Sequence, residues 1–164
     1  MSYSNLLNGK KWYLGQSQMF IGTYYHTLEA HGRVSLPKAF REKNQKWVVT
    51  RGLDGGLFLF SQDDFFDQLT ELNSRTFTKK RNRDFVRLMT NEAIEVEPDK
   101  NGRVQLPEYL IAFAKLKKEL VIVGSLSKVE IWDRAVYHNY VQVIEDNSES
   151  IAESLEEHND ATTT

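Results

Sequence analysis

Apolar and polar residues alternate in a short segment near residue 34, and the same alternation returns seventy residues later. The segment 32–37 reads Gly-Arg-Val-Ser-Leu-Pro, and the segment 102–107 reads Gly-Arg-Val-Gln-Leu-Pro. Because the side chains of a strand point alternately to its two faces, the valine and the leucine of each copy are predicted to face a core. The arginine and the residue after the valine are predicted to face outward. The inward set is Val34, Leu36, Val104 and Leu106, and the outward set is Arg33, Ser35, Arg103 and Gln105.

The same succession of further elements follows each of these strands. A proline, at position 37 or 107, suits the first turn of a short helix, which we expect over 38–44 and 108–115. Next come a hairpin with a tight turn and then a longer amphipathic helix that begins after a residue able to cap it. The hairpins pair Trp47–Arg51 with Leu57–Phe60 and Leu120–Gly124 with Val129–Trp132, and the capping residues are Ser61 and Asp133.

The repeat extends well beyond the hexapeptide. With an offset of 72 residues, the segment 48–60 aligns with 120–132, and Gly52 falls on Gly124. A period of this length indicates a duplicated small domain rather than a solenoid. One copy of about 45 residues buries too little apolar surface to be stable alone. We therefore expect an α+β fold in which the two copies interleave their hairpins around one core.

The chain is predicted to divide into five parts along this duplication. A helix expected over 78–89 connects the two halves and carries a run of basic residues. It is either a solvated helix face or a helix that contacts phosphates or packs in an oligomer. Its basic residues are Lys79, Lys80, Arg81, Arg83 and Arg87. The five parts are an N-terminal extension (1–18), a first half (19–66), a linker with the basic helix (67–91), a second half (92–144) and an acidic disordered tail (145–164).

Charge is distributed unevenly along the chain. All 21 lysines and arginines lie at or before Arg134, whereas seven of the 23 acids follow it, so residues 1–134 carry a net charge of +5. An acidic tail of this kind is usually solvated and disordered. The alternative is a tail that competes with nucleic acid for the basic surface. The longest apolar stretches, such as Leu120–Val123, are too short to span a bilayer, which favours a cytoplasmic protein.

The sequence offers little for an enzyme. There is no cysteine, which excludes disulfides, thiolate metal sites and cysteine nucleophiles. No carboxylate pair or serine–histidine set stands out, and the glycines at 52, 55 and 56 suit a hairpin turn better than a phosphate loop. The four histidines, at 26, 31, 138 and 158, are not in a metal-ligand spacing. We therefore expect no catalytic residues, no metal, no cofactor and no small-molecule substrate.

Four stretches together carry a family resemblance. They are MFIGTYYHTLEAHGRVSLPKAFRE from Met19, VVTRGLDGGLFLF, AIEVEPDKNGRVQLP and VEIWDRAVYHNY. In order and wording they closely resemble the MraZ family of bacterial transcription regulators, over Met19 to about Ile144. The resemblance implies two halves like the AbrB transition-state regulator, which means a duplicated swapped-hairpin, double-psi-like β barrel with short helices and an internal pseudo-twofold. It also implies a homo-oligomeric ring that binds short direct repeats upstream of the division and cell-wall gene cluster containing its own gene, and hence a nucleoid-associated protein.

The family's signature is an acid, three residues and then an arginine, once in each half. The second half has it intact at Asp99–Arg103, and the first half has the milder form Glu29–Arg33. His31 stands where a lysine is common in the family, which puts a phosphate contact from that position in doubt. The resulting candidate DNA-binding residues are Glu29, His31, Gly32, Arg33, Asp99, Lys100, Gly102 and Arg103.

The chemistry of the signature suits double-stranded DNA independently of the family. A two-stranded ribbon fits the major groove, and an arginine at its turn can pair bidentately with guanine. The acid four residues earlier can hold the guanidinium in one rotamer. The alternative is that both acid–arginine pairs only brace surface turns, in which case the protein is a ring-forming interaction or structural module that does not read DNA.

Overall fold

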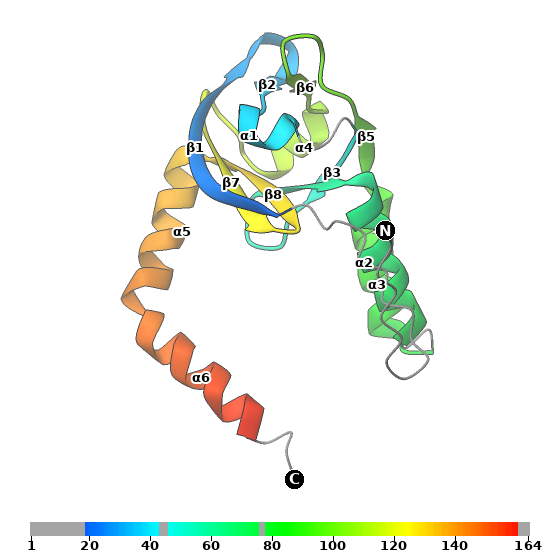
Figure 1. Ribbon diagram of the computed structural model, residues 1–164, viewed down its shortest axis with the longest axis vertical. Helices are drawn as coiled ribbons and strands as arrows, with labels where there is room; N and C mark the ends of the chain where they lie inside the picture. Colours follow the sequence, from blue (N-terminus) through cyan, green and yellow to red (C-terminus); the bar gives the residue numbers. More distant parts are fainter. Residues whose placement is uncertain (1–18, 43–45, 76–77, 161–164) are drawn as a thin grey trace, which may run out of the picture.

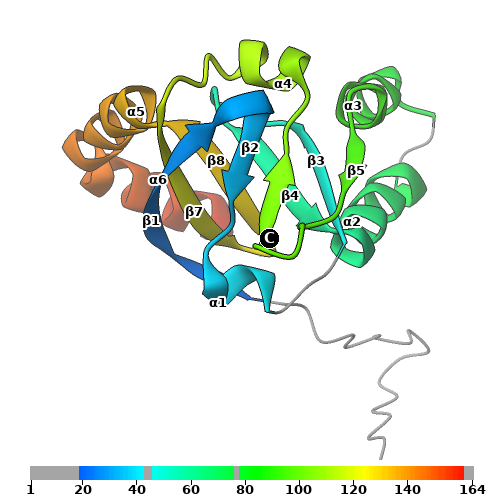
Figure 2. The same cartoon turned by 90° about the horizontal axis from the view of Figure 1, so that it is seen from above.

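The strands of the two halves interleave in one antiparallel sheet, which curls into a nearly closed barrel (Figures 1 and 2). The computed structural model describes residues 19–42, 46–75 and 78–160. Within them the eight-stranded sheet has the order β5-β3-β4-β8-β7-β1-β2-β6. The strands are β1 (Phe20–Glu29), β2 (Arg33–Ser35), β3 (Trp47–Arg51), β4 (Leu57–Ser61), β5 (Ile94–Val96), β6 (Arg103–Gln105), β7 (Glu119–Leu126) and β8 (Lys128–Asp133). The helices are η1 (Ala30–Gly32), α1 (Lys38–Arg41), α2 (Gln62–Arg75), α3 (Lys80–Asn91), α4 (Glu108–Phe113), α5 (Arg134–Asp146) and α6 (Ser148–Asp160).

Each half lends its first strand to the other half. β1 pairs antiparallel with β7 along eight positions, from Phe20 opposite Leu126 to Thr27 opposite Glu119. In the reciprocal exchange, β5 pairs with β3 over three positions. The hairpins expected from the sequence, β3–β4 and β7–β8, are confirmed. The interleaving explains how two small copies close a single core that neither could close alone.

The strand register reveals the internal pseudo-twofold axis. In the β2–β6 pair, Val34 lies opposite Val104, which is the same position of the hexapeptide in the other half. In the β4–β8 pair, Phe58 lies opposite Glu130, its counterpart at an offset of 72 residues. An axis that passes through both pairs relates the halves, so the predicted duplicated α+β barrel is confirmed.

The core of the barrel consists of the inward positions of both halves. Val34, Val104, Leu36 and Leu106 are at most 2% exposed, as the alternation predicted. Aromatic rings complete the packing at one end, where Phe20 meets Phe40 edge to face with 5.4 Å between ring centroids. The same cluster includes Trp47, Leu57, Leu59, Leu110, Leu120, Ile122, Val129 and Ile131.

The helices begin where the sequence places them, but two end differently. Ser61 Oγ accepts a hydrogen bond from Asp64 N, and Asp133 Oδ1 accepts from Ala135 N and Val136 N, so both predicted caps are confirmed. α4 ends at Phe113, before the expected 115, because Lys115 adopts a left-handed conformation that terminates a helix. α1 is described as far as Arg41, and residues 43–45 of its expected range lie outside the described residues.

A second, smaller apolar cluster lies outside the barrel. α2 and α3 form a hairpin that covers Phe58 and Phe60 of β4, and Met89 of α3 is buried with them. Thr50 Oγ1 of β3 donates to the Met89 carbonyl at 2.8 Å, which fixes the end of α3 against the sheet. The connecting helix therefore exists as expected, but it covers Lys80–Asn91 rather than 78–89.

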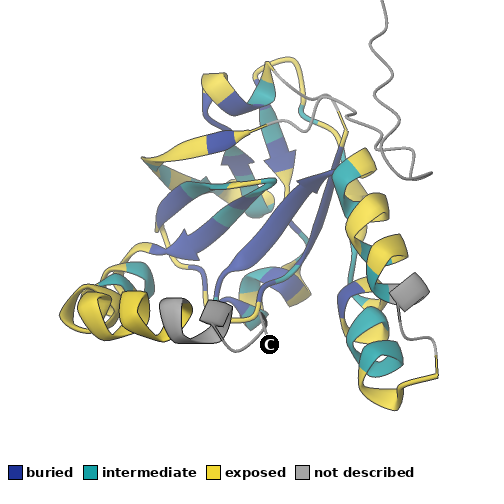
Figure 3. Ribbon diagram, turned by 60° about the horizontal axis from the view of Figure 1, so that its bottom comes forward, coloured by how far each residue is buried: buried dark blue, intermediate teal, exposed yellow. Residues whose placement is uncertain are grey.

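The acidic tail differs from its prediction. Residues 148–160 form α6 instead of a disordered segment, while residues 161–164 and the extension 1–18 lie outside the described residues. Alanine, leucine and glutamate within α6 favour a helix, and Glu149 in its first turn suits the helix dipole. Net charge alone therefore predicted the wrong local state. The solvation was expected correctly, because each residue from 148 to 155 is exposed (Figure 3).

Candidate nucleic-acid interface

The two signature turns lie next to each other at one end of the barrel, where β2 pairs with β6 (Figure 1). Reciprocal backbone hydrogen bonds connect them across the pseudo-twofold axis. Leu36 N donates to the Gly102 carbonyl at 3.0 Å, and Leu106 N donates to the Gly32 carbonyl at 2.8 Å. Each turn is thus fixed by the strand that leaves the other turn, which places Arg33 and Arg103 on one end of the molecule.

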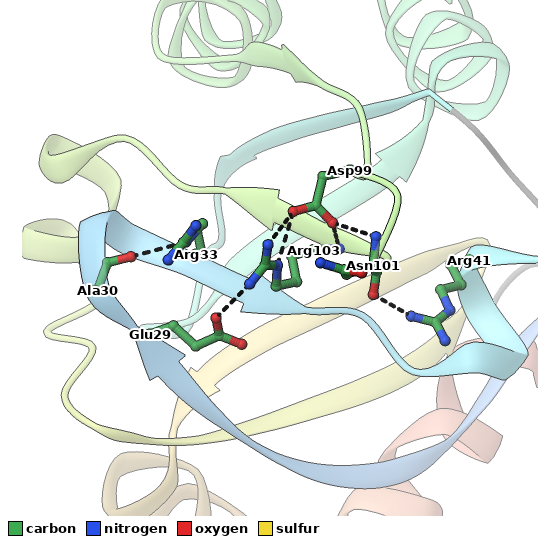
Figure 4. Close-up of polar contacts among 7 residues, drawn as sticks. All are labelled: Glu29, Ala30, Arg33, Arg41, Asp99, Asn101 and Arg103. Carbon is green, nitrogen blue, oxygen red and sulfur yellow. Dashed lines mark hydrogen bonds and ion pairs between the residues drawn. The ribbon is translucent and has the colours of Figure 1, made fainter.

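In the second turn, one carboxylate organises the backbone and the arginine together. Asp99 Oδ1 accepts from Asn101 N at 2.8 Å and from Arg103 N at 3.0 Å. Asp99 Oδ2 accepts from Arg103 Nε at 2.9 Å and lies 2.8 Å from Arg103 Nη2 (Figure 4). The hydrogen bond from the Arg103 side chain, with help from the backbone amides, lowers the pKa of Asp99 to about 2. The predicted acid–arginine pair is therefore confirmed in this half.

In the first turn the predicted pair does not form. Glu29 Oε2 lies 3.3 Å from Arg103 Nη1, so the glutamate reaches the arginine of the other half. Arg33 instead donates from Nε to the Ala30 carbonyl at 3.3 Å and has no acidic partner among the described residues. The expected Glu29–Arg33 bridge was wrong because the β2–β6 pairing brings Arg103 within reach of Glu29. Arg103 consequently lies between two carboxylates, whereas Arg33 has none (Figure 4).

Both turns need glycine before the arginine. Gly32 and Gly102 have φ angles of 72° and 74°, in the left-handed region that favours glycine. A Cβ atom on Gly32 would lie 2.7 Å from the Leu106 carbonyl oxygen and 2.9 Å from Ile111 Cδ1. The space above Gly102 is filled by the side chain of Arg41.

Arg41 is a residue of the site that the sequence analysis missed. From α1 of the first half, its Nη1 donates to the Asn101 carbonyl in the second turn at 2.8 Å (Figure 4). At the repeat offset of seventy, Arg41 corresponds to Ile111, which packs over Gly32 in the first turn. That alignment was the available signal: one turn is braced by a charged side chain and the other by an apolar one.

The remaining candidates in the turns are exposed. His31 adopts a φ angle of 61° within η1, and Lys100 lies in the second turn next to Asn101. An open groove beside the second turn is lined by Lys38, Arg41 and Lys100 together with the acids Glu42, Glu97 and Asp99. Cationic and anionic groups therefore alternate around Arg103.

The basic helix is not brought together with the turns. The α2–α3 hairpin projects from the other end of the barrel (Figure 1). Lys80 Nζ lies 2.5 Å from Asp84 Oδ2 and Arg87 Nη1 lies 3.1 Å from Asp84 Oδ1, and the hydrogen bond from Lys80 is the main reason why the pKa of Asp84 is lowered. Arg83 Nη1 donates to the Thr78 carbonyl at 2.9 Å, while Lys79 and Arg81 are exposed. A contact of this helix with the same DNA that meets the turns is thus not favoured by its position.

Two searches of the described ranges concern other kinds of site. No group of three or more histidine, aspartate or glutamate side chains there is arranged to hold a metal ion. None of the helices in those ranges has the length and apolarity to cross a membrane.

Comparison with known sequences agrees with the duplicated architecture. The profile of the family described as "MraZ protein, putative antitoxin-like" matches the chain twice, at residues 19–88 and 89–159. The chain belongs to the MraZ family. A relative from Carboxydothermus hydrogenoformans, named transcriptional regulator MraZ, is 44% identical over 138 residues, which cover 84% of this chain and 96% of the relative. The finer division of this MraZ chain at 66, 91 and 144 stays a prediction.

Proposed function

We propose that this MraZ chain is a sequence-specific DNA-binding transcription regulator. It acts as a homo-oligomeric ring in the cytoplasm, at the nucleoid, on short direct repeats upstream of its own operon in the division and cell-wall gene cluster. The observation that carries the proposal is the pair of glycine–arginine turns at one end of the barrel, linked by reciprocal backbone hydrogen bonds. The name of the relative, transcriptional regulator MraZ, supports the same class of function.

The geometry of the turns suggests how they act on a duplex. Each turn is a thin two-stranded ribbon that enters the major groove, because glycine keeps the backbone narrow beside the arginine. Arg33, without an acidic partner, offers its guanidinium to guanine O6 and N7. Arg103 is already oriented by Asp99 and Glu29, which reduces the conformational entropy that it loses on binding.

The other candidate residues contribute position rather than sequence recognition. Lys100 and His31 are exposed beside the arginines and contact phosphates. The exposed basic residues of α3 serve ring packing, since α3 lies at the other end of the barrel from the turns. One subunit reads few bases, and a ring that presents several pairs of turns to successive repeats gains the missing affinity through avidity.

Fluorescence anisotropy on the promoter DNA of the protein's own gene cluster tests the proposal. Wild type, the double variant Arg33→Ala with Arg103→Ala, and the control Arg134→Ala are compared on promoter and scrambled DNA over a salt series. Arg134 matches the charge change but pairs with Glu119 at the start of α5. We expect preference for promoter DNA to disappear in the double variant with the oligomer intact, and to persist in the control.

The competing function is a ring-forming interaction or structural module that does not read DNA. Both guanidinium groups lie beside acceptors within the protein, as turn-bracing residues would. Binding that is unchanged in the double variant, or equal on scrambled DNA, supports this module and contradicts our proposal.

A further inference from the structure

The C-terminal helix α6 is a surface in search of a partner. It has thirteen residues, and each of those from 148 to 155 is exposed. An isolated helix of this length is marginally stable in water, so contact with an apolar surface is needed to hold it. Ile151 and Leu155, four residues apart and 42% and 64% exposed, lie on one face of the helix. Ile144, seven residues before Ile151 in the last turn of α5, is 38% exposed.

A matching apolar cavity lies between the α2–α3 hairpin and the sheet. Its volume is about 330 Å³. Leu53 lies at its edge and is 57% exposed, so the mouth of the cavity is apolar as well as the interior. The apolar lining consists of Leu53, Phe58, Phe60, Phe65, Leu69, Leu72, Phe85 and Met89, and we refer to it as the α2–α3 cavity.

Within one molecule these two surfaces do not meet. α5 and α6 extend from one side of the barrel, and α2 and α3 extend from the opposite side, in both the side view and the view from above (Figures 1 and 2). The first candidate for an occupant of the cavity is therefore α6 of a second copy.

Charge complementarity favours this occupant. After Arg134 the chain has no lysine or arginine, and Glu145, Asp146, Glu149 and Glu153 are exposed along α5 and α6. Beside the cavity, α3 presents exposed Lys80, Arg81 and Arg87. An acidic helix laid across the cavity places its carboxylates next to these cations, and such complementarity selects both partner and orientation.

We propose that α6 of one subunit packs across the α2–α3 cavity of the next, with Ile151 and Leu155 facing the cavity and the glutamates beside α3. The donor and acceptor surfaces differ, so the contact is heterologous and propagates head to tail until it closes. The inference deepens the proposed function, since it rests on the ring and names the contact that builds it. It also gives the basic helix a role other than binding DNA.

Two complementary variants test this contact without using DNA. The tail variant carries Ile151→Asp and Leu155→Asp, and the cavity variant carries Leu53→Asp and Arg81→Glu; all four residues are exposed, so the fold is retained. Leu126→Asp is the matched control, because Leu126 is 64% exposed like Leu155 but lies between β7 and β8. Circular dichroism verifies folding, and native mass spectrometry reports the assembly.

We expect wild type and the control to form the ring and each variant alone to fall to the 19.1 kDa chain. A mixture of the two variants retains one intact tail and one intact cavity, so it forms a 1:1 dimer that cannot grow. Rings that persist in either variant, or a mixture that stays monomeric, overturn the contact while leaving the proposed DNA-binding ring standing. A ring lost only in Leu126→Asp moves the interface to the β7–β8 turn. A monomeric wild type contradicts the ring and the contact together.

Discussion

In the second turn, Asp99 binds two backbone amides and the guanidinium of Arg103, and Glu29 approaches the same guanidinium from the other half. In the first turn, the equivalent Arg33 contacts only the Ala30 carbonyl by the side-chain hydrogen bonds of the described residues. The two turns share a signature, a glycine and a left-handed backbone, yet one arginine is fixed and the other is not.

This difference separates the two requirements of a base-reading side chain. A fixed arginine loses little conformational entropy on binding, but it must exchange carboxylates for the base. A free arginine keeps its hydrogen-bonding capacity, but binding must order it. The duplication therefore produced two turns with different balances, and a shared signature does not imply an equal contribution.

The largest expected effect concerns the glycines. Gly32→Ala should lower the free energy of unfolding by roughly 2–4 kcal/mol, since positive φ costs ~1–2 kcal/mol and the new Cβ meets the Leu106 backbone carbonyl. Gly102→Ala should cost less, about 1–2 kcal/mol, because the obstructing Arg41 side chain can move away. Urea unfolding measures both. Gly55→Ala serves as the control, since Gly55 has a φ of 112° with only ordinary contacts around its Cβ position. Equal losses at Gly32 and Gly55 would contradict the backbone clash.

The single arginine variants sharpen the comparison in binding. Arg33→Ala should lower affinity for promoter DNA by roughly 5- to 150-fold, as expected for one base contact of ~1–3 kcal/mol, and leave the unfolding midpoint unchanged. Arg103→Ala should lower affinity and also lower the unfolding midpoint, because it removes the pairs with Asp99 and Glu29. Anisotropy and thermal unfolding on the same preparations give both quantities. If the midpoint falls equally in the two variants, the asymmetry of the turns is not real.

The brace on the second turn gives a smaller effect. Arg41→Leu replaces the polar brace by one like Ile111 and removes the hydrogen bond to the Asn101 carbonyl. The loss should be about 0.5–1.5 kcal/mol of unfolding free energy. Amide hydrogen exchange should accelerate at Gly102 and Arg103 and stay unchanged at Gly32 and Arg33. Faster exchange in both turns would show that α1 supports the barrel end as a whole.

The sequence predicted the elements better than the contacts between halves. Alternation located Val34 and Val104 in the core, and local spacing correctly paired Asp99 with Arg103. Glu29 was assigned to the wrong arginine because its partner depends on the register between β2 and β6, which local spacing does not contain. Arg41 was missed for the same reason, since its acceptor lies 60 residues away.

The finest test of the comparison is the titration of Asp99. The hydrogen bond from Arg103 lowers its pKa in the folded protein to about 2, from 3.8 without partners. A lowered pKa means that the stabilisation by this pair is fully present above pH 3.8 and is lost as the pH falls through about 2. The carboxyl ¹³C shift of Asp99 should therefore titrate near 2 in wild type and closer to 3.8 in Arg103→Ala, whereas Arg33→Ala should leave it near 2. A wild-type midpoint near 3.8 would mean that Arg103 is as free in solution as Arg33, and the two turns would then be equivalent readers.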